Sequence, residues 1–235
     1  MSDGRAGRAG GDGPRILTQS ELSAFLRCKR KWYLGSYLKL KKRRYSGSAP
    51  LSIGTLVHYG LEAYYRPDDR THPIDAIKAK CLRMIDEFPE ASNDIIKCAD
   101  LAGIMLEGYM EWLEEKGADA DLDVYAAEEK VEVEIRPTDR HPALGPKYIL
   151  RGKMDARARR KSDDTHLQLE HKSVGNLADL PKTAQTNFQY LTYDLLAYLK
   201  SLESDATIRT DGVLLNMLRK VKRTAAAKPP FYDRH

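Results

Sequence analysis

Apolar residues in the first half of the chain recur at helical spacing. The pattern begins at Thr18, and Ser20 can cap the first helix. The apolar positions of this helix are Leu22, Phe25, Leu26 and Tyr33. The same three- and four-residue steps predict further helices at residues 52–65, 74–88 and 93–116. We therefore expect the N-terminal half of the chain to be helical.

The period of the pattern then changes to two. Val131, Val133 and Ile135 alternate with glutamates, which is typical of a strand with one buried face. Residues 148–159 and 166–173 predict two more strands, and the Ser-Asp-Asp-Thr sequence between them suits a hairpin turn. These three strands follow the helical half directly.

A long helix at residues 183–202 and an apolar strand at residues 212–218 complete the pattern. The order of helices, three strands, helix and strand predicts an α/β fold, with a central mixed β-sheet flanked by helices. Gln185, Gln189 and Tyr193 are spaced four apart and form a polar stripe on the long helix. Its core-facing residues are predicted to be Phe188, Leu191, Leu195 and Leu199.

Length and composition indicate one domain with a tail. Residues 1–14 are rich in glycine and contain no large apolar side chain after Met1, so we expect a disordered tail there and a single domain at residues 15–235. No apolar run approaches the roughly 18 residues of a membrane span. Cys28, Cys81 and Cys98 are widely spaced and odd in number, which fits a reducing compartment. A soluble, cytoplasmic protein of a bacterium or an infecting phage is expected, without a membrane partner.

Basic residues are clustered along the chain. Lysine and arginine exceed aspartate and glutamate by 39 to 34, and they concentrate at residues 27–31, 39–44, 157–161 and 219–223. Any one of these runs is as readily a solvated face as a binding surface. Together they become informative only if the chain has a polyanionic substrate.

The predicted hairpin carries the candidate chemistry. Glu170 and Lys172 lie two apart on one strand and share a face, whereas His171 points to the other face. A turn centred between residues 163 and 164 sets Asp155 opposite this region, so two carboxylates converge. Such an oxygen-rich pair suits Mg²⁺ or Mn²⁺ beside a lysine that can hold a water or a phosphate. On these three residues alone, an ordinary exposed Glu-x-Lys pair is the better interpretation.

The flanking residues resemble a known family, the RecB-like exonuclease branch of the PD-(D/E)XK nuclease superfamily. Its five blocks occur in the expected order, and they span most of the chain beyond the tail. The blocks are Thr18-x-Ser20 with Phe25-x-x-Cys28-x-Arg30-x-Trp32-Tyr33, then Gly54-x-x-x-His58, then Glu128, then Gly152-Lys153-Met154-Asp155 with Glu170-His171-Lys172, and finally Gln189-x-x-x-Tyr193. The joint match is more specific than any single block.

The resemblance implies a restriction-endonuclease-like sheet and a role for each matched residue. His58, Asp155 and Glu170 would ligate the metal, and Lys172 would be the catalytic lysine. Glu128 would support the metal site or a second ion. Gln189 and Tyr193 would contact the DNA strand near the cut.

Each of the less central residues also has a plainer interpretation. A lone histidine such as His58 on an apolar helix is more often a hydrogen-bonded boundary residue. Gln189 and Tyr193, taken alone, fit an ordinary amphipathic helix. Glu128 is chosen over the nearby glutamates because it keeps the family's spacing to the alternating strand, and a slip of one residue would reverse its face.

The sequence departs from the family pattern in three places. Met154 stands where the superfamily's naming proline would precede Asp155, although the RecB-like branch commonly uses a Gly-x-x-Asp form. Lys29 follows Cys28 where proline is frequent. Some relatives hold an iron–sulfur cluster through one cysteine in the opening helix and three near the C-terminus. No cysteine follows Cys98, so we expect the phage or CRISPR-associated RecB-like type without a cluster.

The function expected from the resemblance is Mg²⁺- or Mn²⁺-dependent DNA exonuclease activity in recombination, repair or phage DNA processing. The alternatives are an endonuclease with the same site, or a DNA-binding module of the same fold. We also expect residues 27–45, where aromatic and basic residues interleave, to guide a single strand or a duplex end. For Trp32 and Tyr33, the better interpretation is that they are core residues of the first helix. A protein partner in a recombination or replication assembly is a further expectation.

Overall fold

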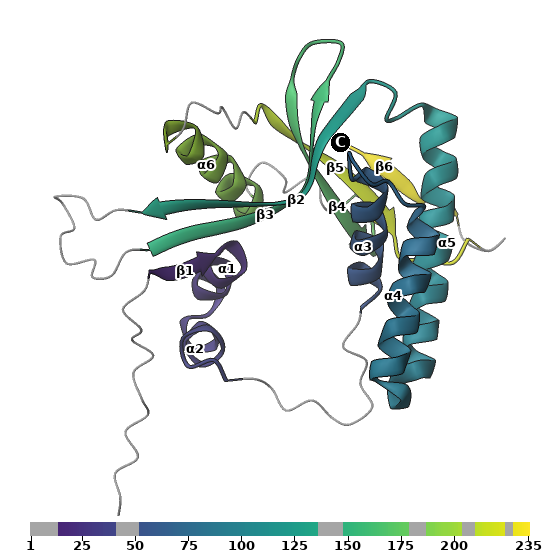
Figure 1. The fold of residues 1–235 in the computed structure, drawn as a ribbon, viewed down its shortest axis with the longest axis horizontal. Helices are drawn as coiled ribbons and strands as arrows, with labels where there is room; N and C mark the ends of the chain where they lie inside the picture. The colour runs from purple at the N-terminus through teal and green to yellow at the C-terminus, as the bar shows by residue number, and fades with distance from the viewer. Residues whose placement is uncertain (1–13, 41–51, 136–147, 179–186, 204–209, 224–227) are drawn as a thin grey trace, which may run out of the picture.

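The computed structural model shows a mixed β-sheet with helices on both of its faces (Figure 1). It describes residues 14–40, 52–135, 148–178, 187–203, 210–223 and 228–235. The tail predicted at residues 1–14 lies, apart from Pro14, outside the described residues. No helix of the described part is long and apolar enough to cross a membrane.

The N-terminal segment is more broken than its periodicity predicts. A strand that the sequence did not indicate, β1 (Arg15–Thr18), leads into α1 (Gln19–Arg27), α2 (Lys29–Trp32) and the π-helix η1 (Tyr33–Tyr37). The prediction that Ser20 caps the helix was wrong. Thr18 is the cap, because its extended backbone lets Oγ1 accept a hydrogen bond from the Glu21 amide at 3.2 Å. The helix then stops at Cys28, whose backbone is also extended.

The next helices agree closely with the predicted ranges. They are α3 (Ile53–Tyr65), α4 (Pro73–Glu87) and α5 (Ser92–Lys116), with the short 3-10 helix η2 (Pro89–Ala91) before the last. Ser52 caps α3 by accepting from the Thr55 amide at 3.2 Å. These helices pack together on one side of the sheet (Figure 1), and they bury the largest apolar cluster of the described residues against it.

Strands of both orientations make up the sheet, which confirms the predicted α/β fold with a central mixed sheet. The predicted strands are observed as β2 (Leu122–Ile135), β3 (Tyr148–Arg160), β4 (His166–Val174) and β5 (Gly212–Arg219). The short β6 (Tyr232–Arg234) was not predicted. The pairs β2–β3, β3–β4 and β5–β6 are antiparallel, whereas β1–β3 and β4–β5 are parallel.

The sheet forks at the middle of β3. β2 follows one edge of β3 along most of its length. The other edge is shared, because β1 pairs with residues 148–151 and β4 pairs with residues 156–159. No described strand pairs with residues 152–155 on that edge. In Figure 1, β2 and β3 extend from this point as an arm, with β1 along its edge, away from the helices α3 to α5.

The long C-terminal helix, α6, packs on this arm with a different face from the one predicted. It is described from Phe188 to Glu203, and Gln185 lies outside the described residues. Leu191 and Leu195, predicted to face the core, are 51% and 48% exposed. The buried residues of the helix are Tyr190, Thr192, Tyr193, Leu196 and Ala197.

The close approach of α6 to β3 explains this rotation. A Cβ atom at Gly152 would lie 2.5 Å from Leu196 Cδ1 and 3.0 Å from Tyr193 Cδ1. Only a glycine at position 152 therefore lets Tyr193 and Leu196 pack directly against β3. Since α6 has apolar residues on two sides, periodicity alone did not distinguish the face that packs on Gly152 from the face that remains exposed.

Candidate active site

Asp155 and Glu170 come together at the fork of the sheet. The register pairs Ala156 with Leu169, so the next position sets Asp155 opposite Glu170, as the hairpin pattern predicted. The two strands part at this point. The His171 amide donates to Asp155 Oδ2 at 2.9 Å, which supplies the hydrogen bond that the ended ladder no longer provides.

The backbone of the β2–β3 pair is irregular beside Asp155. The ladder passes from Ala127–Ala156 to Glu129–Met154, and Glu128 between them has a positive φ of 54°. Met154 packs in the cluster beneath α6, whereas Ala156 packs in the cluster beneath α3 to α5. Residues two apart normally share a face, so β3 turns over here. Asp155, at the turning point, can reach both layers.

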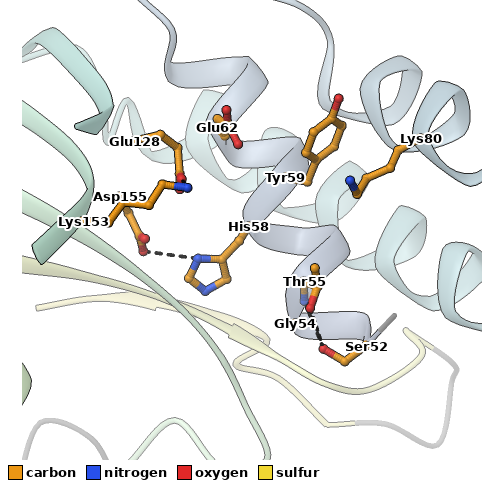
Figure 2. Close-up of a pocket in the computed structure, with 10 residues that line it drawn as sticks. All are labelled: Ser52, Gly54, Thr55, His58, Tyr59, Glu62, Lys80, Glu128, Lys153 and Asp155. Carbon is orange, nitrogen blue, oxygen red and sulfur yellow. Dashed lines mark hydrogen bonds and ion pairs between the residues drawn. The ribbon is translucent and has the colours of Figure 1, made fainter. Parts of the chain in front are cut away.

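His58 on α3 contacts Asp155 directly. Its Nδ1 lies 3.3 Å from Asp155 Oδ2, and Figure 2 shows the imidazole pointing at the carboxylate. Burial raises the pKa of Asp155, but the hydrogen bond from His58 and the nearby imidazole of His171 outweigh it and lower the pKa to about 2. Asp155 is therefore ionised at neutral pH.

Glu170, Lys172 and Gln189 form a tight polar group on the α6 side. Glu170 Oε1 accepts from Lys172 Nζ, and it also accepts from Gln189 Nε2 at 2.6 Å. Lys172 Nζ in turn donates to Gln189 Oε1 at 3.2 Å. Gln189 thereby holds both Glu170 and Lys172 in place. An amide can do this because it carries both a donor and an acceptor.

The carboxyl group of Glu170 is held in an unfavourable environment for a negative charge. The residue is 1% exposed, and burial together with the negative charge of Asp155 raises its pKa to about 6. Lys172 offsets only part of this effect. Two carboxylates that repel one another in a buried site are stabilised when a cation joins them.

The residues present fit a hard divalent cation as a pair of oxygen ligands. Glu170 Oε2 is buried and has no hydrogen-bond partner among the described residues, although buried carboxylate oxygens are normally satisfied. Asp155 and Glu170 supply the carboxylate oxygens that Mg²⁺ and Mn²⁺ prefer. In this conformation the described residues include no group of three or more His, Cys, Asp or Glu side chains that could hold a metal. His58 contacts Asp155 itself.

Glu128 lies on the other side of Asp155 and lines a pocket of about 570 Å³. Its Oε2 forms an ion pair with Lys153 Nζ. Figure 2 shows this pocket between α3 and the strands that carry Glu128 and Asp155. Its lining residues are Ser52, Gly54, Thr55, His58, Tyr59, Glu62, Lys80, Glu128, Lys153 and Asp155. The sequence assigns no role to Lys153 or Lys80, because no local pattern brings α4 and β3 to one pocket.

Tyr193 is brought to the site but does not face solvent. Its ring is 6% exposed and packs on Gly152, while its hydroxyl lies 3.3 Å from Gln189 Nε2, which donates to it. Burial raises the pKa of Tyr193 to about 12, so the hydroxyl stays protonated. Of the predicted residues, the structure thus gathers His58, Asp155, Glu170, Lys172, Gln189 and Tyr193 in one connected set, with Glu128 at its margin.

The sequence matches a known protein family over most of its length. A family model described as the PD-(D/E)XK nuclease superfamily matches residues 16–232 of the chain. A search of curated proteins finds no match. Among solved structures, the chain is similar to one titled "Crystal structure of SSO0001", with 16% identity over 70% of each chain and a TM-score of 0.27. The family match covers every residue of the candidate site.

Proposed function

Because this chain belongs to the PD-(D/E)XK nuclease superfamily, whose members are metal-dependent nucleases, we propose that it is a DNA exonuclease that uses Mg²⁺ or Mn²⁺. The observation that carries the proposal is the convergence of Asp155 and Glu170 at the fork, beside Lys172, with one buried oxygen of Glu170 left without a partner among the described residues. An ordinary surface Glu-x-Lys pair would have no reason to be buried there.

We propose that Asp155 and Glu170 hold the metal. Bound between them, a divalent ion would polarise the scissile phosphate and make a bound water more acidic at neutral pH. His58 fixes the orientation of the Asp155 carboxylate through its 3.3 Å contact. Its role is therefore that of a positioning residue in this conformation, and binding of the ion would decide whether it also becomes a ligand.

Lys172 is the residue that we expect to act on the reacting groups. The Lys172 side chain is 25% exposed, and it projects from the strand that carries Glu170. It can therefore orient the attacking water or neutralise charge that develops on the phosphate. Gln189 keeps the ammonium group in place, and Tyr193 supports the Gln189 amide from the protein interior.

The pocket beside Asp155 offers a second binding region for the substrate. Lys80, Lys153 and the hydroxyl of Thr55 line it together with Glu128. Its polar lining and its direct connection to Asp155 favour a nucleotide or the sugar-phosphate backbone over an apolar ligand. We propose that the strand being cut passes between α3 and β3 here. Glu128 would hold the Lys153 ammonium group in place through their ion pair, or support a second ion.

The finer assignment to a RecB-like exonuclease in recombination, repair or phage DNA processing is supported by the order of the five sequence blocks. Exonuclease and endonuclease share the same chemistry and differ in whether the channel requires a DNA end. A cytoplasmic location and a protein partner in a larger assembly belong to the same proposal.

A cleavage assay tests this function. Linear DNA labelled at either end and closed circular DNA are incubated with Mg²⁺, Mn²⁺ or EDTA. We expect degradation of linear DNA alone, loss of activity in EDTA and loss of activity in Lys172→Ala. Lys116→Ala is the matched control, because Lys116 lies at the exposed end of α5. Cleavage of the circle would favour an endonuclease, and full activity in EDTA would exclude the metal mechanism.

A further inference from the structure

An exposed pair of stacked tyrosines lies outside the site described above. Tyr33 and Tyr37 belong to the π-helix η1, and their ring centroids are 5.3 Å apart with an interplanar angle of 15°. The rings are 47% and 45% exposed. The interpretation of Tyr33 as a core residue of the first helix was therefore wrong. π-helical turns are uncommon and occur frequently at functional sites.

The tyrosine pair is held in place from one side. Arg15 Cζ lies 5.4 Å from the ring centroid of Tyr37 and 5.4 Å from that of Trp32. Glu21 accepts from Arg15 at 2.8 Å and from Trp32 Nε1 at 2.9 Å, so a buried carboxylate fixes both supports. Held in this way, the two rings are positioned before any partner binds, which lowers the entropy cost of binding.

The surroundings of the pair are basic. Between residues 22 and 40 the chain has five lysine and arginine residues and no aspartate or glutamate: Arg27, Lys29, Arg30, Lys31 and Lys39. All five are exposed. A segment whose exposed charges are all basic attracts a polyanion, whereas a segment that docks another protein usually carries both signs of charge or few charges.

Stacked aromatic rings within a basic surface fit an unpaired nucleic-acid strand. Bases of a single strand have free faces that can stack on tyrosine rings, while lysine and arginine hold the phosphates. In a duplex the bases already stack on one another, so the rings would have no such partner. We propose that Tyr33 and Tyr37 form a stacking platform for an unpaired strand of the substrate.

This inference rests on the proposed nuclease function and deepens it by naming the form of the substrate. The platform belongs to η1, which follows α2 directly; in Figure 1, α2 lies next to α1, and α1 lies beside β3. α1 contacts both β3 and α6, the elements that carry Asp155 and Gln189. A strand held by the platform therefore binds on the side of the molecule where α1 packs against these two elements.

Binding measurements in EDTA test the platform independently of cleavage. The parent is the full-length Lys172→Ala variant, and the probes are a fluorescent oligothymidylate and a fluorescent duplex of equal length. Fluorescence anisotropy gives the dissociation constants. We expect Tyr33→Ala/Tyr37→Ala to weaken binding of the single strand roughly ten-fold or more and to change duplex binding less than two-fold. Tyr33→Phe/Tyr37→Phe should restore binding, because stacking requires the ring and not the hydroxyl.

Two further variants separate stacking from charge. Arg30→Ala/Lys31→Ala should reduce the slope of log Kd against log salt by about 1.4, at roughly 0.7 for each phosphate that is no longer neutralised, whereas the alanine variant of the tyrosines should keep the parent slope. Tyr198→Ala, which removes a ring that is 61% exposed on α6, is the matched control and should bind as the parent does. Thermal unfolding monitored by circular dichroism checks that each variant is folded.

The proposal is overturned if the folded alanine variant binds the single strand as tightly as the parent, or loses affinity equally for single strand and duplex. Because these measurements report binding by the Lys172→Ala parent in EDTA, neither result depends on catalysis. The converse result is also distinct: a protein that binds single strands through Tyr33 and Tyr37 but leaves DNA intact with Mg²⁺ or Mn²⁺ keeps the platform and loses the proposed nuclease function.

Discussion

The two faces of β4 at the site both carry polar residues, but these residues contact different partners. Glu170 and Lys172 face α6, and His171 between them faces the helices α3 to α5. On the α6 side, Glu170 keeps a buried oxygen without a partner among the described residues, and its pKa is raised. That arrangement places unfavourable interactions at the proposed active site. On the His171 side, buried polar groups join widely separated parts of the chain.

His171 begins a polar network that ends at β6. Burial lowers its pKa to about 3, so the imidazole is neutral and Nδ1 can accept from Asn216 Nδ2 at 3.1 Å. Asn216 Oδ1 accepts from Arg234 Nε at 2.5 Å, which fixes the orientation of the amide. Arg234 also pairs with Asp119 at 2.8 Å and donates to Tyr109 at 3.0 Å. We infer that this face contributes stability and that the other contributes activity.

The largest expected effect that tests this difference is in Lys172→Ala. Loss of one positioned cation at the reacting phosphate should lower the rate of cleavage on the order of 10²–10³-fold. Affinity for DNA in EDTA should remain close to that of the wild type. Single-turnover cleavage with saturating protein separates the two quantities. A variant that cleaves at the wild-type rate would show that the α6 face is not the reactive one.

The opposite result is expected for Arg234→Ala. The Arg234 side chain is 9% exposed, and its removal leaves Asp119 and Asn216 without the guanidinium group that they contact. The free energy of unfolding should therefore fall by about 3 kcal/mol. Urea unfolding measures it. Arg159→Ala is the control, because its pair with Asp164 is exposed and should contribute less than about 1 kcal/mol. Cleavage per folded molecule should persist, and an unchanged stability would contradict the structural role of the network.

Two neighbouring leucines of α6 sharpen the comparison further. Leu196→Ala should lower the free energy of unfolding by about 3 kcal/mol, because Leu196 is 0% exposed and seals the α6 face over Gly152. Leu195→Ala should change it by less than about 0.5 kcal/mol, since Leu195 is 48% exposed. Thermal unfolding of the two variants side by side measures the difference. Equal losses would mean that α6 packs with another face.

The smallest expected effect is a pH dependence caused by Glu170. Its pKa is raised in the folded protein to about 6 from an ordinary value of 4.5, so the folded state binds more protons between these values. Stability from this group is therefore fully present below about pH 4.5 and is lost as the pH rises through 6, by roughly 1–2 kcal/mol in EDTA. Urea unfolding of wild type and Glu170→Gln across this range isolates the contribution. Parallel profiles of the two proteins would rule it out.

Much of the site was predictable from the sequence because it depends on local geometry. A short turn between two strands of period two sets Asp155 opposite Glu170, and the Glu-x-Lys spacing places Lys172 beside Glu170. The helix that carries His58 agrees with the range 52–65 that the apolar spacing predicted. These features need only the alternation of strands, the helical spacing and the order of the blocks.

Other features depend on packing between distant segments, and only the tertiary structure decided them. The reversal of β3 at Asp155 lies where one edge of β3 passes from β1 to β4 while β2 follows the other edge, and no local pattern contains that arrangement. The face of α6 that is buried depends on the missing Cβ of Gly152, far away in the sequence. The sequence thus determined which chemical groups are present and which strand neighbours they have. Tertiary contacts decided which of those groups are buried, because burial depends on what the rest of the chain covers.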